Sequence, residues 1–193
     1  MKNNVILTDC DGVLLDWEYS FTVWMKRHGH VPVDGGMNKY KMHERYDLSP
    51  AECKKLIRMF NESAAIGFLP PLRDSIHYVR KLHEQHGYVF HVITSLSDDP
   101  NAQILRTKNL ENVFGESVFE KFVYLDTGAD KDQALAEYKD TECWWIEDKP
   151  ENCEEGLKVG LNSILIDHLH NSDYNTTFRA RKWKEVYNLI TGN

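Results

Sequence analysis

Five short apolar runs, separated by longer segments, constrain the fold of this chain more than any other feature. They cover residues 5–7, 88–93, 122–125, 144–146 and 164–166. Most of them are continuously apolar, which is typical of strands that helices cover on both faces of a parallel sheet. The sequence therefore predicts an α/β fold with a Rossmann-like, doubly wound parallel sheet.

Helix-end signals lie between these runs. Prolines open the stretch PPLRDSIHYVRKLHEQHGY, and Gly87 stands where its helix should stop. In the stretch DKPENCEEGLKVGLN, Pro150 suits the first helical turn and Gly160 suits the C-terminal cap. Both stretches predict a helix that ends directly before a strand.

The segment after the first run lacks a convincing strand. It contains one helical pattern over residues 17–28 and a second that starts at Ser49, Pro50 and Glu52, which follow the order of an N-cap, a first-turn proline and a capping box. We interpret this segment as a small helical cap inserted after the first strand. The predicted domains are a core of residues 1–15 and 70–193 and a cap of residues 16–69.

Four aromatic residues cluster at the start of the expected cap: Trp17, Tyr19, Phe21 and Trp24. A small helical domain must bury apolar side chains, so these rings can form its core. The alternative is that one or two of them stack on a base or sugar of a substrate. The sequence leaves both interpretations open.

Length and charge limit the classes of function. The chain has 193 residues and a formal net charge of −7, which offers no general attraction to nucleic acid or to an anionic membrane. No apolar run approaches the ~18 residues that span a bilayer, and the N-terminus lacks a signal-peptide pattern. The four cysteines form no CxxC pair and are expected to be reduced. We expect a cytoplasmic protein, as a monomer or homodimer, with neither nucleic acid nor membrane as its partner.

Polar residues gather where the expected strands end. Ligands of an open parallel sheet bind beyond the carboxyl ends of its strands, so residues at those ends should lie close together. They are Asp9 and Asp11 after the first strand, Thr94 and Ser95 after the second, Lys131 after the third, and Glu147 and Asp148 after the fourth.

Crowded carboxylates raise one another's pKa unless a cation compensates. A site of oxygen ligands favours Mg²⁺ over zinc, which prefers histidine or thiolate. Phosphoryl transfer requires neutralised oxygen charge and a positioned nucleophile. Asp9 can supply that nucleophile and form an aspartyl phosphate, while Asp11 can act as general acid and then as general base.

Four stretches carry a resemblance to a known family. DCDGVLLD, VITSLS, GADKDQAL and WWIEDKPEN, in this order and at these strand ends, look like the four motifs of the haloacid dehalogenase-like (HAD) phosphatase superfamily. The resemblance implies that Asp9 is the nucleophile and a Mg²⁺ ligand. It also implies that Asp11 is the general acid/base and offers its backbone carbonyl to the metal.

The same resemblance suggests roles for the remaining residues. Thr94 would donate a hydrogen bond to the transferring phosphoryl group, and Lys131 would pair with its oxygens and with Asp9. Asp148 would complete the metal site, with Glu147 as its support or as the alternative ligand. Many members of the superfamily have two aspartates where this chain has Glu147 and Asp148, so which acid reaches the metal stays open.

Two of these residues have rival interpretations. Lys121 could replace Lys131, but it precedes the third strand and should lie at the wrong edge of the sheet. Ser95 could assist Thr94 in binding phosphate, or it could form only a local bond to the backbone.

Two further stretches are given no predicted catalytic role. The histidine pair His168 and His170 could bind a metal, but solvent exposure is the preferred interpretation. The C-terminal stretch TTFRARKWKEVYNLI predicts one amphipathic helix. Its apolar positions Phe178, Trp183, Val186 and Ile190 would pack on the sheet, and its basic positions Arg179, Arg181, Lys182 and Lys184 would face water.

These observations predict a Mg²⁺-dependent phosphatase that hydrolyses a small phosphomonoester through an aspartyl-phosphate intermediate. Two stretches, WWIEDKPEN and the residues that lead into VITS, are similar to the 5'(3')-deoxyribonucleotidase branch, which makes a nucleoside monophosphate the first substrate to consider. The alternatives are a 3'-phosphatase on nucleic acid ends, a sugar-phosphate phosphatase or mutase, and a non-catalytic domain that binds a phosphorylated ligand or a protein. Dehalogenation is not expected, because that branch lacks the aspartate found here as Asp11.

Overall fold

The computed structural model describes residues 4–39 and 41–192, with Asn38 described by its backbone alone. Six strands form one parallel sheet in the order β3-β2-β1-β4-β5-β6. This is the order of a doubly wound nucleotide-binding sheet, and it confirms the predicted α/β fold class. The strands are β1 (Val5–Thr8), β2 (Val89–Ser95), β3 (Phe119–Leu125), β4 (Trp144–Glu147), β5 (Asn162–Ile166) and β6 (Phe178–Ala180).

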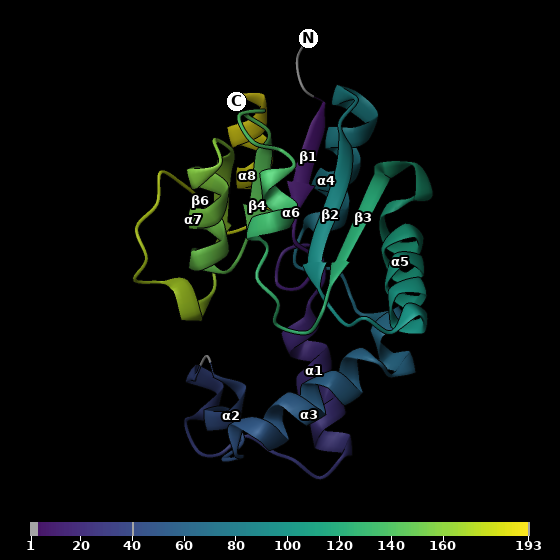
Figure 1. Ribbon diagram of the computed structural model, residues 1–193, viewed down its shortest axis with the longest axis vertical. Helices are drawn as coiled ribbons and strands as arrows, with labels where there is room; N and C mark the ends of the chain where they lie inside the picture. The colour runs from purple at the N-terminus through teal and green to yellow at the C-terminus, as the bar shows by residue number, and fades with distance from the viewer. Residues whose placement is uncertain (1–3, 40, 193) are drawn as a thin grey trace.

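Helices occupy most of the remaining described chain (Figure 1). The α-helices are α1 (Trp17–Arg27), α2 (Met42–Arg45), α3 (Pro50–Asn61), α4 (Ser75–His86), α5 (Pro100–Phe114), α6 (Asp132–Ala136), α7 (Pro150–Lys158) and α8 (Trp183–Thr191). Four short 3-10 turns connect them: η1 (Gly36–Asn38), η2 (Ala64–Phe68), η3 (Glu116–Val118) and η4 (Leu169–Asn171).

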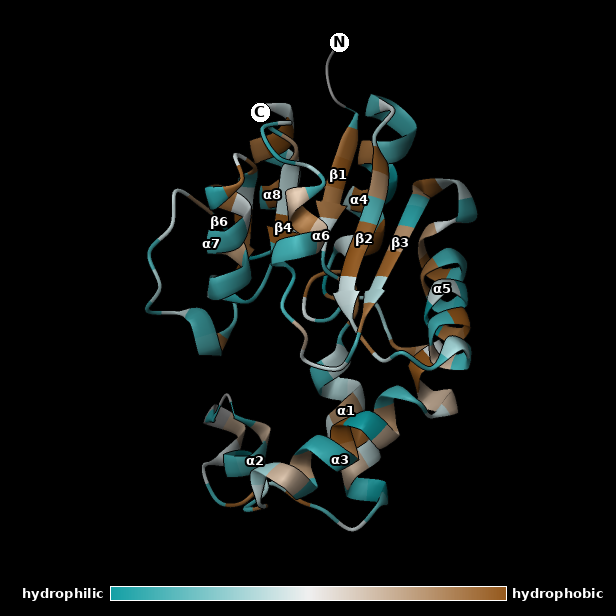
Figure 2. Ribbon diagram, viewed as in Figure 1, coloured by the Kyte–Doolittle hydropathy of each residue, from teal (hydrophilic) through white to brown (hydrophobic). Residues whose placement is uncertain are grey.

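The sheet is buried on both faces because neighbouring residues of each strand point to opposite sides. In β1, Ile6 belongs to the larger apolar core, whereas Leu7 belongs to a second core that includes Leu135 of α6. Figure 2 shows β1 and much of β2 and β3 in the hydrophobic colour, whereas the helices around them carry both hydrophobic and hydrophilic residues. Burial on both faces explains why the strands appear in the sequence as continuous apolar runs.

Local signals in the sequence place several helix ends correctly. Ser49 and Glu52 form the expected capping box at the start of α3. Gly87 caps α4 with a φ of 71°, and Pro150 occupies the first turn of α7. The prolines before α4 do not open that helix, however, because Pro71 pairs with Leu15 and the helix begins only at Ser75.

The prediction of a single C-terminal helix was wrong in its first part. Residues 178–180 form the edge strand β6, which pairs with β5, and α8 starts at Trp183. Trp183 and Val186 are buried as expected. Arg179 forms an ion pair with Asp167 in place of the expected solvent contact. The free edge of β5 offers backbone hydrogen bonds to this segment, and helical periodicity carries no information about them.

The segment between β1 and α4 lies beyond the carboxyl ends of the strands, where Figure 1 shows α1, α2 and α3 grouped together. Two stretches of chain run side by side as it leaves and rejoins the core. The Asp16 amide donates to the Pro70 carbonyl, and the Leu72 amide donates to the Leu14 carbonyl, both at 2.8 Å. The domain boundaries at residues 16 and 69 remain predictions.

Two other features bear on the sequence-based expectations. All four cysteines are buried, and no disulfide joins any two of them. Within residues 4–39 and 41–192, no helix has the length and apolar character needed to cross a membrane.

Candidate active site

A tight turn after β1 presents the two aspartates of the first motif. The Asp9 amide donates to the Ile146 carbonyl at 2.9 Å, which extends the pairing of β1 with β4 by one residue. The Leu14 and Leu15 amides then both donate to the Cys10 carbonyl, which turns the chain back. Asp9 is 7% exposed and its backbone is bonded to β4, so the sheet holds this residue in a fixed position.

Lys131 connects the first and fourth motifs. It is the N-cap residue of α6, and its side chain is almost fully buried. Its Nζ atom lies 2.8 Å from Asp9 Oδ1 and 2.8 Å from Glu147 Oε2. The rival Lys121 lies within β3 and pairs with Glu137 at the protein surface. The structure thus brings Lys131, and not Lys121, to the aspartates.

Glu147 has no free oxygen in this arrangement. Its Oε1 accepts the backbone amides of Asp148 and Lys149 at 2.9 and 3.0 Å. Its Oε2 accepts Lys131 Nζ at 2.8 Å and Asn152 Nδ2 at 3.1 Å. Each oxygen of Glu147 thus already accepts two hydrogen bonds.

Asp148 has a different environment. One oxygen from each of Asp9, Glu147 and Asp148 can be chosen so that all three lie within 4.8 Å of one another, which is a spacing suited to a metal ion. The Asp148 carboxylate lies against Gly12, where a Cβ atom would come within 2.4 Å of its Oδ2. Since the donors around Glu147 leave it no free lone pair, Asp9 and Asp148 are the two carboxylates that fit direct coordination.

Burial and neighbouring charges together explain the pKa shifts of the cluster. Burial raises the pKa of Asp9 to about 6, although the Lys131 ammonium opposes this shift. Burial and the nearby Asp9 charge raise the pKa of Asp148 to about 7. Among the residues that the structure describes, these two carboxylates and those of Asp11 and Glu147 are paired with two buried cations, Lys131 and Arg106. The excess of two negative charges and the all-oxygen donor set fit one divalent ion such as Mg²⁺.

The two hydroxyl residues at the end of β2 have separate environments. Thr94 is 1% exposed and lines the cavity beside Asp9. The Ser95 hydroxyl donates to the Ala129 carbonyl at 2.8 Å and so ties β2 to the loop before α6. This bond reaches a residue 34 positions away, so it is not the local bond considered from the sequence. Ser95 also lines the cavity, and its assistance to Thr94 in phosphate binding stays a prediction.

Arg106 is a site residue that the sequence-based predictions missed. It is fully buried in α5, and its guanidinium donates to both oxygens of Asp11 and, at 2.8 Å, to the Cys10 sulfur. A signal for it does exist in the sequence. The buried residues of α5 include Ala102, Arg106, Asn109 and Leu110, which follow helical spacing, so a charged residue occupies the inward face of the helix.

The histidine pair does not lie on the solvated surface, so that expectation was wrong. His168 Nε2 lies 2.7 Å from the Gly12 carbonyl, and His170 Nε2 lies 3.0 Å from the Asp148 carbonyl. Burial lowers the pKa of both rings, which favours their neutral forms. The turn η4 folds this segment back over the sheet, and the two histidines hold the backbone on either side of the carboxylate cluster.

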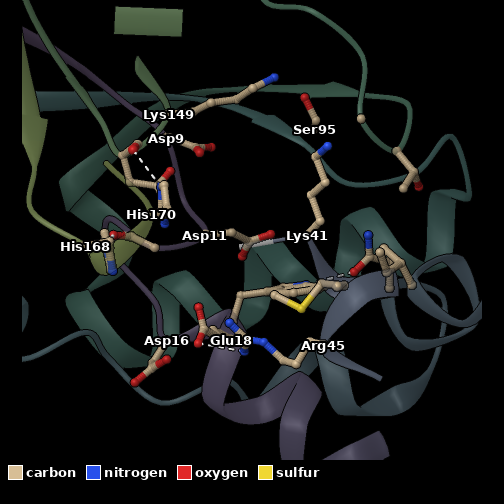
Figure 3. Close-up of a pocket in the computed structure, with 18 of the residues that line it drawn as sticks. Asp9, Asp11, Asp16, Glu18, Lys41, Arg45, Ser95, Lys149, His168 and His170 are labelled. Atoms are coloured by element: carbon tan, nitrogen blue, oxygen red, sulfur yellow. Dashed lines mark hydrogen bonds and ion pairs between the residues drawn. The ribbon is translucent and has the colours of Figure 1, made fainter. Parts of the chain in front are cut away.

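A cavity of about 990 Å³ opens between this cluster and α1–α3. Figure 3 shows Asp9 and Asp11 on one side of it and Glu18 and Arg45 on the other. Most of the aromatic cluster forms apolar packing, since Phe21 is fully buried and stacks on Trp17 at 4.6 Å between ring centroids. Tyr19 is 61% exposed and lines the cavity. Of the four aromatic residues, it is the one that is both highly exposed and part of the cavity wall.

Comparisons with known proteins agree with this fold. No protein-family model matches the sequence. The chain is 26% identical to a 32.4 kDa protein of Enterobacteria phage T4, encoded in the Gp30-rIII intergenic region, over 96% of this chain and 69% of the relative.

Solved structures of HAD-like hydrolases are similar over the whole chain. A predicted phosphatase from Clostridium acetobutylicum has a TM-score of 0.68 at 16% identity, with all of both chains covered. A HAD-like family hydrolase from Streptococcus pneumoniae has a TM-score of 0.66 at 19% identity, covering 98% of each chain. The HAD-hydrolase YfnB from Bacillus subtilis, solved with magnesium bound, has a TM-score of 0.62 at 14% identity, covering 99% of this chain and 100% of that one. The chain therefore has the fold of HAD-like hydrolases.

Proposed function

We propose that this protein is a Mg²⁺-dependent phosphatase of the HAD superfamily that hydrolyses a phosphomonoester through an aspartyl-phosphate intermediate. The observation that carries the proposal is the ion pair between Lys131 and Asp9 inside a buried carboxylate cluster at the carboxyl ends of β1 and β4. This arrangement combines a nucleophile, a fixed cation and an acidic ion site within one crevice.

The residues divide the reaction as follows. The Asp9 carboxylate attacks phosphorus, and the bond from phosphorus to the leaving oxygen breaks while Asp11 donates a proton to that oxygen. Asp11 then accepts a proton from water, which attacks the aspartyl phosphate, releases inorganic phosphate and restores the Asp9 carboxylate. Lys131 neutralises negative charge on the phosphoryl oxygens, and Thr94 donates a hydrogen bond to them.

Asp9, Asp148 and the Asp11 backbone carbonyl would hold the magnesium ion. When bound, the ion supplies charge neutralisation at the phosphoryl oxygens and lets the carboxylates stay ionised side by side. Glu147 would hold Lys131 and the backbone of Asp148 in place without touching the ion, as its four donors indicate.

A nucleotide is the substrate class that the cavity supports best. The exposed ring of Tyr19 offers a flat apolar surface for a base or sugar, and the volume of about 990 Å³ is large enough for a nucleotide. The similarity of WWIEDKPEN to the 5'(3')-deoxyribonucleotidase branch points to the same class.

The test is phosphate release from para-nitrophenyl phosphate and from a panel of nucleotides and sugar phosphates, measured with Mg²⁺ and with a chelator. We expect turnover that requires the metal and that falls at least about 1,000-fold in Asp9→Asn, because asparagine cannot form the covalent intermediate. Asp132→Asn is a matched control, since it makes the same change at the first residue of α6, beside Lys131 and outside the carboxylate cluster. A wild-type protein that releases no phosphate from any compound would overturn the proposal.

A further inference from the structure

Four lysines other than Lys131 line the cavity. Lys39 follows η1, Lys41 is the N-cap of α2, Lys54 lies in α3, and Lys149 follows Asp148 on the core side. Figure 3 shows the side chains of Lys41 and Lys149 extending into the cavity from its two sides. We refer to Lys39, Lys41, Lys54 and Lys149 as the lysine rim.

The charges of the lysine rim are not neutralised within the protein. Among the residues that the structure describes, Lys39, Lys54 and Lys149 form no ion pair. Lys41 approaches only Glu44, at 3.8 Å, and both of these side chains are largely open to water. An ion pair of this kind contributes little, so all four ammonium groups can bind an external anion.

Arg45 shows that part of the rim is held in place. It is 3% exposed, its Nη1 donates to Glu18 at 2.8 Å, and its Nε and Nη2 donate to the Lys39 carbonyl at 3.2 and 3.0 Å. These bonds tie the segment that carries Lys39 to both α1 and α2. A buried arginine thus fixes the backbone from which part of the lysine rim extends.

The rim contrasts with the charge of the whole chain. The chain has a net charge of −7, whereas the cavity is lined by seven Lys and Arg residues and six Asp and Glu residues. Four of those six acids belong to the catalytic crevice: Asp9, Asp11, Glu147 and Asp148. Away from that crevice the lining is therefore positive, which attracts an anionic group other than the phosphoryl group that reacts.

We propose that the lysine rim binds a second phosphate of a nucleotide substrate while the first phosphate reacts at Asp9. This inference rests on the proposed phosphatase function and specifies its substrate. Nucleoside bisphosphates and phosphorylated ends of oligonucleotides share the required chemistry, because both carry another phosphate near the reacting one. Tyr19, 61% exposed, and Leu169, 78% exposed, line the same cavity and can contact the nucleoside between the two phosphates.

The experiment compares kcat/KM in Mg²⁺ for para-nitrophenyl phosphate, thymidine 3'- and 5'-monophosphates, thymidine 3',5'-bisphosphate, and short thymidine oligonucleotides with a terminal 3'- or 5'-phosphate. The variants are Lys41→Ala and Lys54→Ala. The control is Lys55→Ala, which removes the neighbouring exposed lysine of α3 that does not line the cavity. Lys41→Arg keeps the positive charge and serves as the conservative variant.

We expect a second phosphate to raise kcat/KM at least about tenfold over the monophosphates, and the gain should shrink with added salt. Lys41→Ala or Lys54→Ala should each reduce that gain by about fivefold to tenfold and leave para-nitrophenyl phosphate within about twofold of wild type. Lys55→Ala should change nothing, and Lys41→Arg should retain the gain. The better of the bisphosphate and oligonucleotide substrates identifies the source of the second phosphate.

Equal kcat/KM for one and two phosphates, or an equal loss for all substrates in the two alanine variants, would overturn the lysine rim as a phosphate subsite. If no compound is turned over, the phosphatase function fails. Calorimetry on the Asp9→Asn variant then tests whether the lysine rim binds a second phosphate. Thymidine 3',5'-bisphosphate should bind about tenfold more tightly than either monophosphate, and this difference should disappear when Lys41→Ala is added to Asp9→Asn. This result would support the subsite. Equal affinities overturn it.

Discussion

The guanidinium of Arg106 binds the carboxylate of Asp11 although 95 positions separate the two residues in the sequence. Arg106 is the charge that most strongly opposes the rise in the pKa of Asp11 caused by burial. The proposed general acid/base is therefore oriented and tuned by a residue of α5, a helix that contributes nothing to the four sequence motifs.

Arg106→Met should lower kcat by about 10- to 100-fold, because Asp11 loses the donor that orients it. The pKa of Asp11 should rise further, and the limb of the pH–kcat profile that reports this group should move to higher pH. Breaking this buried pair should also lower the free energy of unfolding by about 3 kcal/mol. Steady-state kinetics across pH and urea unfolding measure these effects.

Arg80→Met is the matched control, since Arg80 of α4 donates to the backbone carbonyls of Val113 and Phe114 in α5 and has no side-chain partner in the carboxylate cluster. It should cost stability without moving the pH profile. If Arg106→Met lost stability but kept the wild-type profile and kcat, Arg106 would be a structural residue alone.

Gly12→Ala should separate Asp148 from the metal site. Gly12 has a φ of 74°, and an added Cβ would lie 2.4 Å from Asp148 Oδ2. The carboxylate must move, so the affinity for Mg²⁺ should fall by about tenfold or more, and backbone strain should cost about 1–2 kcal/mol of stability. Calorimetric Mg²⁺ titration and urea unfolding test both effects.

Gly87→Ala supplies the control, because Gly87 has a similar φ of 71° but nothing within 4 Å of the added Cβ. It should lose comparable stability and keep its Mg²⁺ affinity. Unchanged Mg²⁺ affinity in Gly12→Ala would remove Asp148 from the set of direct ligands.

Replacing the two acids of the fourth motif should have different consequences. Asp148→Asn should weaken Mg²⁺ binding by at least about tenfold and leave the fold intact, because it removes a ligand charge. Glu147→Gln places an amide among four donors, so it should lower the free energy of unfolding by about 2–4 kcal/mol. Circular dichroism during urea unfolding, paired with Mg²⁺ titration, distinguishes them. Full stability in Glu147→Gln with lost Mg²⁺ binding would show that Glu147 is itself a ligand.

The stability of the metal-free protein should fall as pH rises. Asp9 and Asp148 have pKa values of about 6 and about 7, against an ordinary value of 3.8. The native state therefore binds more protons than the unfolded chain between these limits, and stability decreases with pH across that window. Added Mg²⁺ should restore more stability at about pH 8 than at about pH 5, because it binds the ionised carboxylates.

Urea unfolding with a chelator and with Mg²⁺ at the two pH values measures this dependence. Asp148→Asn should flatten the pH dependence of the metal-free protein, since one of the two raised groups is gone. Stability that increased with pH in the presence of chelator would contradict the raised pKa values.

The sequence by itself determined the class of fold and the place of the candidate active site. Strands buried on both faces must be apolar along their whole length, so the runs at 5–7, 88–93, 122–125, 144–146 and 164–166 could be recognised without a structure. Parallel strands end at one edge of a sheet, so polar residues that follow such runs must converge. This rule placed Asp9, Asp148 and Lys131 in one crevice.

Only the tertiary structure decided how those residues are used. The free edge of β5 turned residues 178–180 into a strand, and the fold of η4 brought His168 and His170 against the site. The direction of Glu147 toward four donors, the pairing of Arg106 with Asp11 and the lysine rim all join residues from separate elements. The physical reason is the same in each case: burial and charge pairing depend on neighbours in space, and local patterns along a chain carry information only about neighbours in sequence.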